Sequence, residues 1–152
     1  MRWMSPELLA LVQSGLENSR PTKQSDCYAL GMVIYEVLSG QVPFASFNSH
    51  AVTQKVMGGE RPQRPEGVLG AWFTDDIWRM LNRCWATQPE GRPSIMVVLE
   101  CLDQVSREPP PLPAGEDVEM DEDDWNVGRD SSGDRSWSDP RWLVTLLHRI
   151  LC

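Results

Sequence analysis

The sequence has few of the residues that bind transition metals or form disulfides. Its four cysteines (Cys27, Cys84, Cys101 and Cys152) show no CxxC spacing, and its two histidines (His50 and His148) are isolated. This arrangement indicates neither a zinc site nor a disulfide framework, and it places no nucleophile beside a histidine base. We therefore expect reduced thiols, no metal site and no hydrolytic triad in this chain.

Long hydrophobic runs are also lacking. The longest apolar stretch, residues 27–38, is interrupted by Glu36 and is shorter than a bilayer span. No basic and apolar leader precedes a small-residue cleavage site near Met1. These absences predict a soluble cytoplasmic protein with no membrane partner.

Positive charge is scarce, and the shortage is confined to one segment. Residues 1–106 contain 9 Lys and Arg against 11 Asp and Glu, whereas residues 107–139 contain 3 against 11. Phosphate backbones and anionic lipids repel such an acidic segment, so that nucleic acid is not an expected partner. A protein partner, in particular a basic one, remains open.

Capping residues and apolar periodicity predict a mainly α domain over residues 1–106. Pro6 and Glu7 indicate the start of a short helix. Ser25 or Asp26 is expected to cap a longer helix, apolar on almost every side, that ends at Gly40. Further helices are predicted at residues 49–57, after Thr74 or Asp75, and from Ile95 to about Val105 with Ser94 as the cap.

Side chains at helical spacing predict the core. Two inward stripes are expected, one of Ile77, Met80, Leu81, Cys84 and Trp85, and one of Ile95, Val98, Leu99 and Leu102. Trp78 and Trp85 are assigned to packing rather than to a binding surface. The Gly, Pro and Arg loop at residues 58–70 is expected to be exposed.

The chain beyond this domain has a different composition. Residues 107–139 combine a proline run with acidic and Ser/Asp/Gly stretches, and they contain too little apolar surface to offset the entropy of ordering. We predict that this segment is a disordered linker, in which an unmodified spacer is favoured over phosphorylation of its serines. Residues 140–152 form a candidate amphipathic helix that is marginal in water unless it docks.

Four motifs in residues 1–106 together resemble the C-lobe of a protein kinase domain. They are, in order, Arg2-Trp3-Met4-Ser5-Pro6-Glu7, Ser25-Asp26-Cys27-Tyr28-Ala29-Leu30-Gly31, Gly40-Gln41-Val42-Pro43-Phe44, and Cys84-Trp85 with Pro89 and Gly91-Arg92-Pro93. The last group is typical of tyrosine kinases and of tyrosine-kinase-like serine/threonine kinases. The stretch at residues 14–40 most resembles basidiomycete fungal members.

The resemblance implies roles for particular residues. Glu7 and Arg92 would form a buried, bidentate ion pair that ties the activation segment to the helical core. Residues Arg2, Trp3, Met4, Ser5 and Pro6 would be the remnant of a pocket for the protein substrate. Asp26 would anchor the central helix, either as a simple helix cap or as an acceptor for the backbone of the catalytic loop.

The motifs that transfer phosphate in this family do not occur in the sequence. There is no Gly-rich loop, strand Lys, His-Arg-Asp or Asp-Phe-Gly, and the near candidates, Gly58-Gly59 and residues 121–124, lack the required context. The family uses ATP and Mg²⁺, but no catalytic, cofactor or metal residue is predicted here. We expect a truncated C-lobe without the N-lobe β-sheet, starting inside the activation segment and inactive by itself.

Three functional hypotheses follow. The chain is part of an active kinase whose catalytic half is encoded upstream, it is a non-catalytic protein-interaction module, or it is a decayed fragment without a stable fold. Upstream genomic sequence, ATP binding and a cooperative melt distinguish these three hypotheses.

Overall fold

The computed structural model describes residues 1–15 and 20–107, and all regular structure within these two ranges is helical. The helices are α1 (Pro6–Gln13), α2 (Lys23–Ser39), α3 (Ser49–Met57), α4 (Gly67–Gly70), α5 (Asp75–Cys84), the short 3-10 turn η1 (Pro89–Gly91) and α6 (Ile95–Arg107). The predicted mainly α class is therefore confirmed. The predictions for the acidic linker and for residues 140–152 fall almost entirely outside the described residues.

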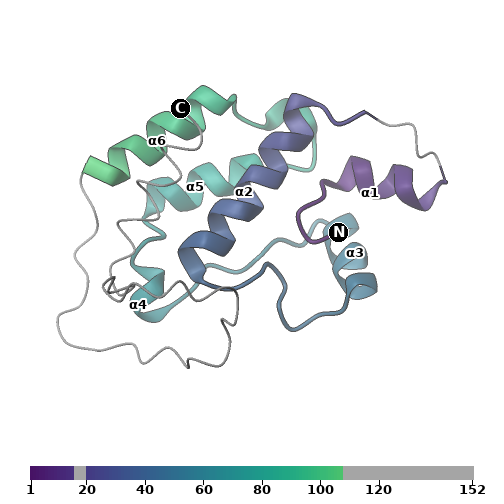
Figure 1. Ribbon diagram of the computed structural model, residues 1–152, viewed down its shortest axis with the longest axis horizontal. Helices are drawn as coiled ribbons and strands as arrows, with labels where there is room; N and C mark the ends of the chain where they lie inside the picture. Colours follow the sequence, from purple (N-terminus) through teal and green to yellow (C-terminus); the bar gives the residue numbers. More distant parts are fainter. Residues whose placement is uncertain (16–19, 108–152) are drawn as a thin grey trace, which may run out of the picture.

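Helix α2 lies at the centre of the described part of the chain (Figure 1). Its cap is Thr22 rather than Ser25 or Asp26, so that prediction was wrong. The Thr22 and Ser25 side chains each accept a hydrogen bond from the other residue's backbone N–H, at 3.1 and 2.8 Å, and form a capping box. At the other end Gly40 adopts a φ of 66°, the left-handed conformation that only glycine adopts at low cost.

Helices α1 and α3 begin where the sequence indicates. Ser5 is the N-cap of α1 and Pro6 its first residue, where the missing N–H of proline costs nothing. Asn48 caps α3 by accepting a hydrogen bond from the N–H of Ala51. Helices α1 and α3 contact each other and lie together on one side of α2 (Figure 1).

On the other side of α2 lie α5 and α6, which also pack against each other (Figure 1). Thr74 caps α5 by accepting from the Ile77 N–H. The inward face of α6 differs from the expected one, because Val98, Leu102 and Val105 are buried whereas Ile95 is 45 % exposed. Ile95, Met96 and Val97 are all exposed, so the buried face of α6 begins only at Val98, and helical spacing did not ensure the burial of Ile95.

The core is one cluster in which α2, α5 and the segment before α5 supply the largest side chains. Trp72, Phe73 and Trp85 are almost fully buried together with Tyr28. Trp78 is half-buried, and its ring packs edge-on against Trp85 with centroids 5.9 Å apart. Trp78 and Trp85 therefore pack in or against the core, as predicted.

The loop between α3 and α5 is less exposed than expected. Pro62 is buried and Arg61 is half-buried, while Gln63 and Arg64 are exposed. Arg64 is paired with Asp75 at 2.8 Å. No helix in the described residues is long and apolar enough to span a membrane.

Candidate functional site

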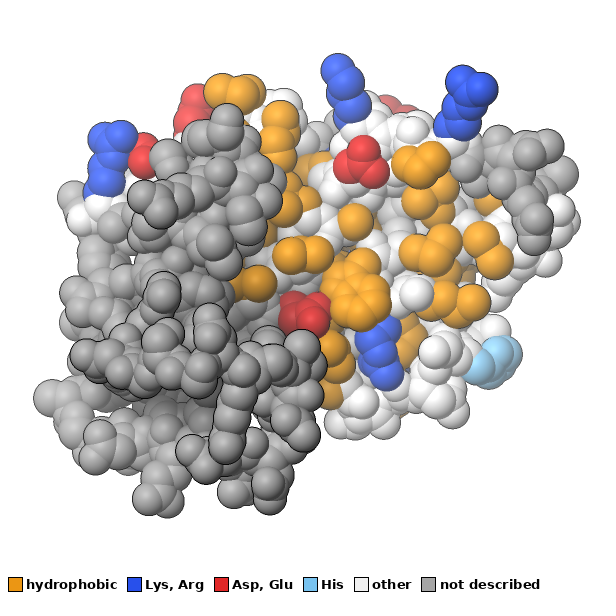
Figure 2. All heavy atoms as spheres, in the orientation of Figure 1, with side chains coloured by type: hydrophobic (Ala, Val, Ile, Leu, Met, Phe, Trp, Pro, Cys, Tyr) orange, Lys and Arg blue, Asp and Glu red, His pale blue; other side chains and the backbone are white. Residues whose placement is uncertain are grey.

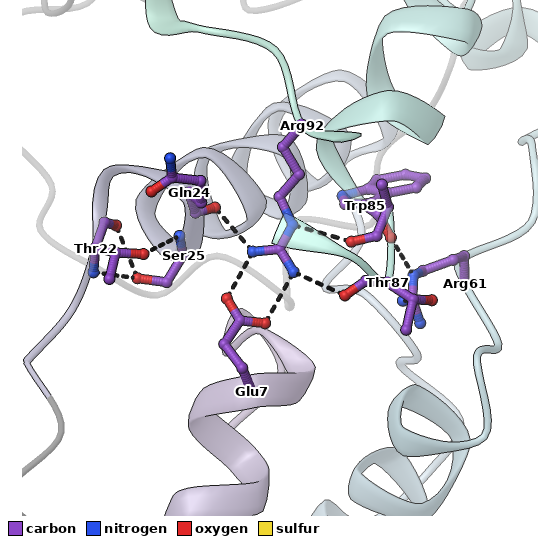
Figure 3. A network of polar contacts seen from close by, with 9 residues as sticks. Glu7, Thr22, Gln24, Ser25, Arg61, Trp85, Thr87 and Arg92 are labelled. Atoms are coloured by element: carbon purple, nitrogen blue, oxygen red, sulfur yellow. Dashed lines mark hydrogen bonds and ion pairs between the residues drawn. The ribbon is translucent and has the colours of Figure 1, made fainter. Parts of the chain in front are cut away.

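Arg92 is the centre of the largest polar network among the described residues (Figure 3). It directly follows η1, and its side chain is 0 % exposed. A guanidinium has five N–H donors. In the structure all five have acceptors, because Nε donates to the carbonyl of Ala86, Nη1 to Glu7 and the carbonyl of Gln24, and Nη2 to Glu7 and the carbonyl of Thr87.

The charged partner of Arg92 is Glu7, in the first turn of α1. Nη1 lies 2.6 Å from Oε1 and Nη2 lies 2.8 Å from Oε2, so that the pair is bidentate although the two residues are 85 positions apart. The Glu7 side chain is 30 % exposed, so only the arginine end of the pair is fully buried. Burial raises the pKa of the Glu7 carboxyl, but the hydrogen bonds from Arg92 and from the backbone outweigh burial, and the pKa lies below its ordinary value of 4.5.

A second arginine, Arg61, contacts residues 85–87, the segment that also accepts hydrogen bonds from Arg92, from the opposite side. Its Nε donates to the carbonyl of Trp85 at 2.8 Å and its Nη2 to the Thr87 hydroxyl at 3.3 Å. The guanidinium groups of Arg61 and Arg92 lie 5.4 and 5.2 Å from the centroid of the Tyr28 ring. Sequence reasoning missed Arg61, since its Arg-Pro context indicated only a loop.

The N-terminal segment that the resemblance assigns to a substrate pocket is bound to the centre of the fold. Arg2 donates to the carbonyls of Pro43, Phe44 and Phe47, in the loop that follows α2. The indole N–H of Trp3 donates to Glu36 of α2 at 2.6 Å. The segment therefore has a defined conformation on the surface of the helical core.

The remaining residues of this segment pack rather than form polar contacts. Met4 is partly buried against the core cluster, and Ser5 and Pro6 are buried. The hydroxyl of Ser5 forms no capping hydrogen bond with α1. Trp3 and Met4 thus cover the core, while Ser5 and Pro6 set the direction in which α1 begins.

Asp26 lies away from these contacts. It is in the first turn of α2, it is exposed, and its side chain forms no hydrogen bond with another described residue. The structure therefore gives Asp26 no capping role, since Thr22 fills it. Within the described residues no three His, Cys, Asp or Glu side chains are arranged to hold a metal ion.

The helical architecture agrees with comparisons of the sequence to known proteins. The family described as protein tyrosine and serine/threonine kinase matches residues 1–102. The probable serine/threonine-protein kinase drkD of Dictyostelium discoideum is 32% identical over 101 residues, which are 66% of this chain and 7% of the relative.

Tyrosine kinases are also similar to this chain. The tyrosine-protein kinase receptor TYRO3 of Danio rerio is 27% identical over 95% of this chain and 15% of its own length. The proto-oncogene tyrosine-protein kinase ROS of Rattus norvegicus is 32% identical over 67% of this chain and 4% of its own length. The chain thus spans a small part of these relatives, and the fungal resemblance stays a prediction. By its family match over residues 1–102, the chain belongs to the protein tyrosine and serine/threonine kinase family, and the described part has the helical fold of a kinase C-lobe.

Proposed function

We propose that this chain supplies the helical half of a kinase domain that phosphorylates protein serine, threonine or tyrosine, and that residues 1–106 are that half. The family match supports the class of reaction. The observation that carries the proposal is the bidentate contact between Glu7 and Arg92, because it joins the first helix to the end of the domain through a buried guanidinium. In this proposal the domain is of the tyrosine-kinase-like group, and it works in the cytoplasm, where its phosphate donor ATP is found.

The substrate of the proposed kinase is a protein, and residues 2–6 form part of its binding surface. Arg2 and Trp3 support this assignment, since their side chains bind the loop after α2 and Glu36 and so keep the segment in one conformation. A preorganised segment loses little entropy when a peptide binds beside it. Asp26 is proposed to accept hydrogen bonds from the catalytic loop, which its exposed carboxylate leaves room for.

The chain alone is proposed not to transfer phosphate, because its sequence contains none of the family's nucleotide-binding or catalytic motifs. The direct test is calorimetry of the purified chain with ATP and Mg²⁺, together with radiolabelled phosphate transfer to a generic protein substrate. We expect neither heat of binding nor label. Saturable ATP binding would contradict the proposal.

The genomic DNA upstream of Met1 tests the other half of the proposal. An in-frame Gly-rich loop, strand Lys and His-Arg-Asp motif would place this chain in a catalytic kinase. Their absence at that locus would contradict the proposal that this chain is half of a catalytic kinase domain. It would leave a second candidate function.

The second candidate is a non-catalytic interaction module, and an apolar surface favours it. Figure 2 shows hydrophobic side chains gathered on one face of the molecule, over α2 and α1. On these two helices Val33 and Val12 are 39 % and 47 % exposed. Exposed apolar groups in contiguous patches mark surfaces that bind other proteins.

A peptide-array experiment distinguishes this module from the kinase half. If the chain is a module, it binds a subset of peptides by itself, and Val33→Glu abolishes that binding. Met96→Glu is the matched control, because Met96 is an exposed apolar residue on α6 that is 60 % exposed. Equal binding by both variants would exclude the surface over α2 as the binding site.

A further inference from the structure

Helix α2 has an apolar stripe that the core covers only in part. Leu30, Val33 and Val37 follow one another at spacings of three and four residues, which places them on one side of the helix. Val33 is 39 % exposed, whereas Leu30 and Val37 are partly buried against the core cluster. On α1, Val12 is 47 % exposed, and Figure 2 shows hydrophobic side chains gathered over these two helices. These four residues form the apolar face of the described part of the chain.

Residues 140–152, which lie outside the described residues, have a sequence that matches this face. Eight of these thirteen residues are apolar, compared with seven of the 32 residues at positions 108–139. In a helix, five large apolar side chains would share one side, because they recur at spacings of three and four: Trp142, Leu143, Leu146, Leu147 and Ile150. A helix of this length is marginal in water by itself, so that docking on an apolar surface would stabilise it.

Charge also favours contact between this segment and α2. Residues 140–152 contain Arg141 and Arg149 but no Asp or Glu. Asp26 and Glu36 lie toward the two ends of the stripe on α2, and Lys23 is the one Lys or Arg of that helix. In helices, the two arginines are about 12 Å apart and the two carboxylates about 15 Å apart, since each residue adds about 1.5 Å. These spacings allow each arginine to approach one carboxylate.

The length of chain between the two parts allows them to meet. The 32 residues at positions 108–139 separate Arg107, the last residue of α6, from Pro140. A random coil of that length has a root-mean-square end-to-end distance of about 30 Å, comparable to the diameter of a domain of about 100 residues. Such a tether gives an effective concentration on the order of 1 mM, so that a Kd of about 0.1 mM would keep the segment docked about nine-tenths of the time.

We propose that residues 140–152 dock as a helix on the apolar face of the same chain. Docking covers Val12 and Val33, and it closes the surface that the second candidate function uses, so that any other protein has to displace the segment. The inference depends neither on phosphate transfer nor on the binding of foreign peptides. Its test measures the segment's own amides, and it can therefore fail while either candidate function stands.

Hydrogen exchange of the full chain, followed by mass spectrometry of peptic fragments, tests the proposal. A synthetic peptide of residues 140–152 gives the exchange rate of the undocked segment. We expect the amides of residues 143–151 to exchange about tenfold more slowly in the chain than in the peptide, because a docked helix protects its N–H groups in proportion to its population. Fragments that cover α2 show whether each variant remains folded.

Two pairs of variants locate the contact. Val33→Glu places a charge on the apolar face and should remove the protection, whereas Met96→Glu, at an exposed apolar residue of α6, should keep it. Within the segment, Leu146→Glu should remove the protection. Thr145→Glu should keep it, because position 145 lies off the apolar side of the predicted helix.

Three results would overturn the proposal. Equal exchange rates in the chain and in the peptide would mean that the segment does not dock. Protection that survives Val33→Glu would place the segment on another surface. Protection that falls on dilution of the chain would assign the contact to a second copy, since docking within one chain does not depend on protein concentration.

Discussion

At the scale of single residues, the fold depends most on a charge that water cannot reach. Arg92 has no exposed side-chain surface, and its five donors are used by one carboxylate and three carbonyls. Lysine has three donors on one nitrogen and cannot reproduce the planar fork. The geometry therefore requires arginine and not merely a positive charge.

Substitution of either partner of this pair is predicted to destabilise the domain. Arg92→Lys should lower the free energy of unfolding by about 3 kcal/mol, since buried carbonyls lose their donors. Glu7→Gln should cost less, about 1–3 kcal/mol, because its side chain is 30 % exposed and water replaces part of the contact. Urea unfolding followed by tryptophan fluorescence measures both values.

Arg79→Lys is the matched control for this prediction. The Arg79 and Asp76 side chains are 70% and 77% exposed, and exposed pairs of this kind contribute about 0–1 kcal/mol. If Arg92→Lys cost no more than Arg79→Lys, the central role of Arg92 would be wrong.

The lowered pKa of Glu7 predicts how stability depends on pH. Because the folded-state pKa lies below the ordinary value of 4.5, ionised Glu7 stabilises the fold at pH values above the unfolded-state pKa. This contribution is lost as the pH falls through the folded-state pKa. The difference in unfolding free energy between the wild type and Glu7→Gln should thus be largest at neutral pH and should shrink in acid.

Urea titrations of the two proteins between neutral pH and pH values below 4.5 measure this difference. Protonated Glu7 is nearly isosteric with glutamine, which is why the two curves are expected to approach each other. A difference that stays constant across this range would show that Glu7 contributes through packing rather than through charge.

At the scale of helices, the close approach of α2 and α5 depends on one glycine. A Cβ on Gly31 would lie 2.8 Å from both the Cys84 Cβ and the Trp85 indole nitrogen. Both of these groups are buried and stiff, so neither can move away without disturbing the core. The packing of the two helices therefore needs the absence of a side chain at position 31.

Gly31→Ala is predicted to lower the free energy of unfolding by about 1–3 kcal/mol through overpacking. Alanine has a higher intrinsic helix propensity by about 1 kcal/mol, so the sign of the change shows which effect is larger. Thermal and urea unfolding provide the measurement.

Gly91→Ala is the comparison for Gly31→Ala, because its added Cβ would lie 3.5 Å from the Ala86 Cβ, an ordinary contact. We expect its effect to stay within about 0.5 kcal/mol. Increased stability of Gly31→Ala would mean that α2 and α5 separate readily.

At the scale of the whole molecule, the helices form one connected unit. Helix α2 contacts α4, α5 and η1, α5 contacts α6, and the Arg92 network joins α1 to the other helices. Two tryptophans, Trp72 and Trp85, are within the core at 1% exposure. Loss of any one contact surface therefore exposes part of the same core.

This connectivity predicts a single cooperative melt of the isolated chain. Far-ultraviolet circular dichroism and tryptophan fluorescence should give the same midpoint, because helices and core are lost together. Heating without a sigmoidal transition would favour the hypothesis of a decayed fragment. Two separate midpoints would show that the α1–α3 side unfolds independently of the α5–α6 side.

Much of the secondary structure was predictable because its signals are local. The start of α1 at Pro6, the cap of α5 at Thr74 and the end of α2 at Gly40 depend on residues within one turn of the helix end. The cap of α2 was misassigned even though its signal is local too, since the reciprocal pair of Thr22 and Ser25 was overlooked.

The sequence by itself determined the helical class, most helix ends and, through the order of its motifs, the family. Only the tertiary structure decided the exposure of Ile95, the contacts of Arg61 and the close approach of Gly31 to Cys84. The physical reason is the distance along the chain over which each kind of signal acts. Caps and periodicity act over a few residues, whereas these contacts depend on how helices far apart in the chain dock, and docking is set by the shape of the whole core.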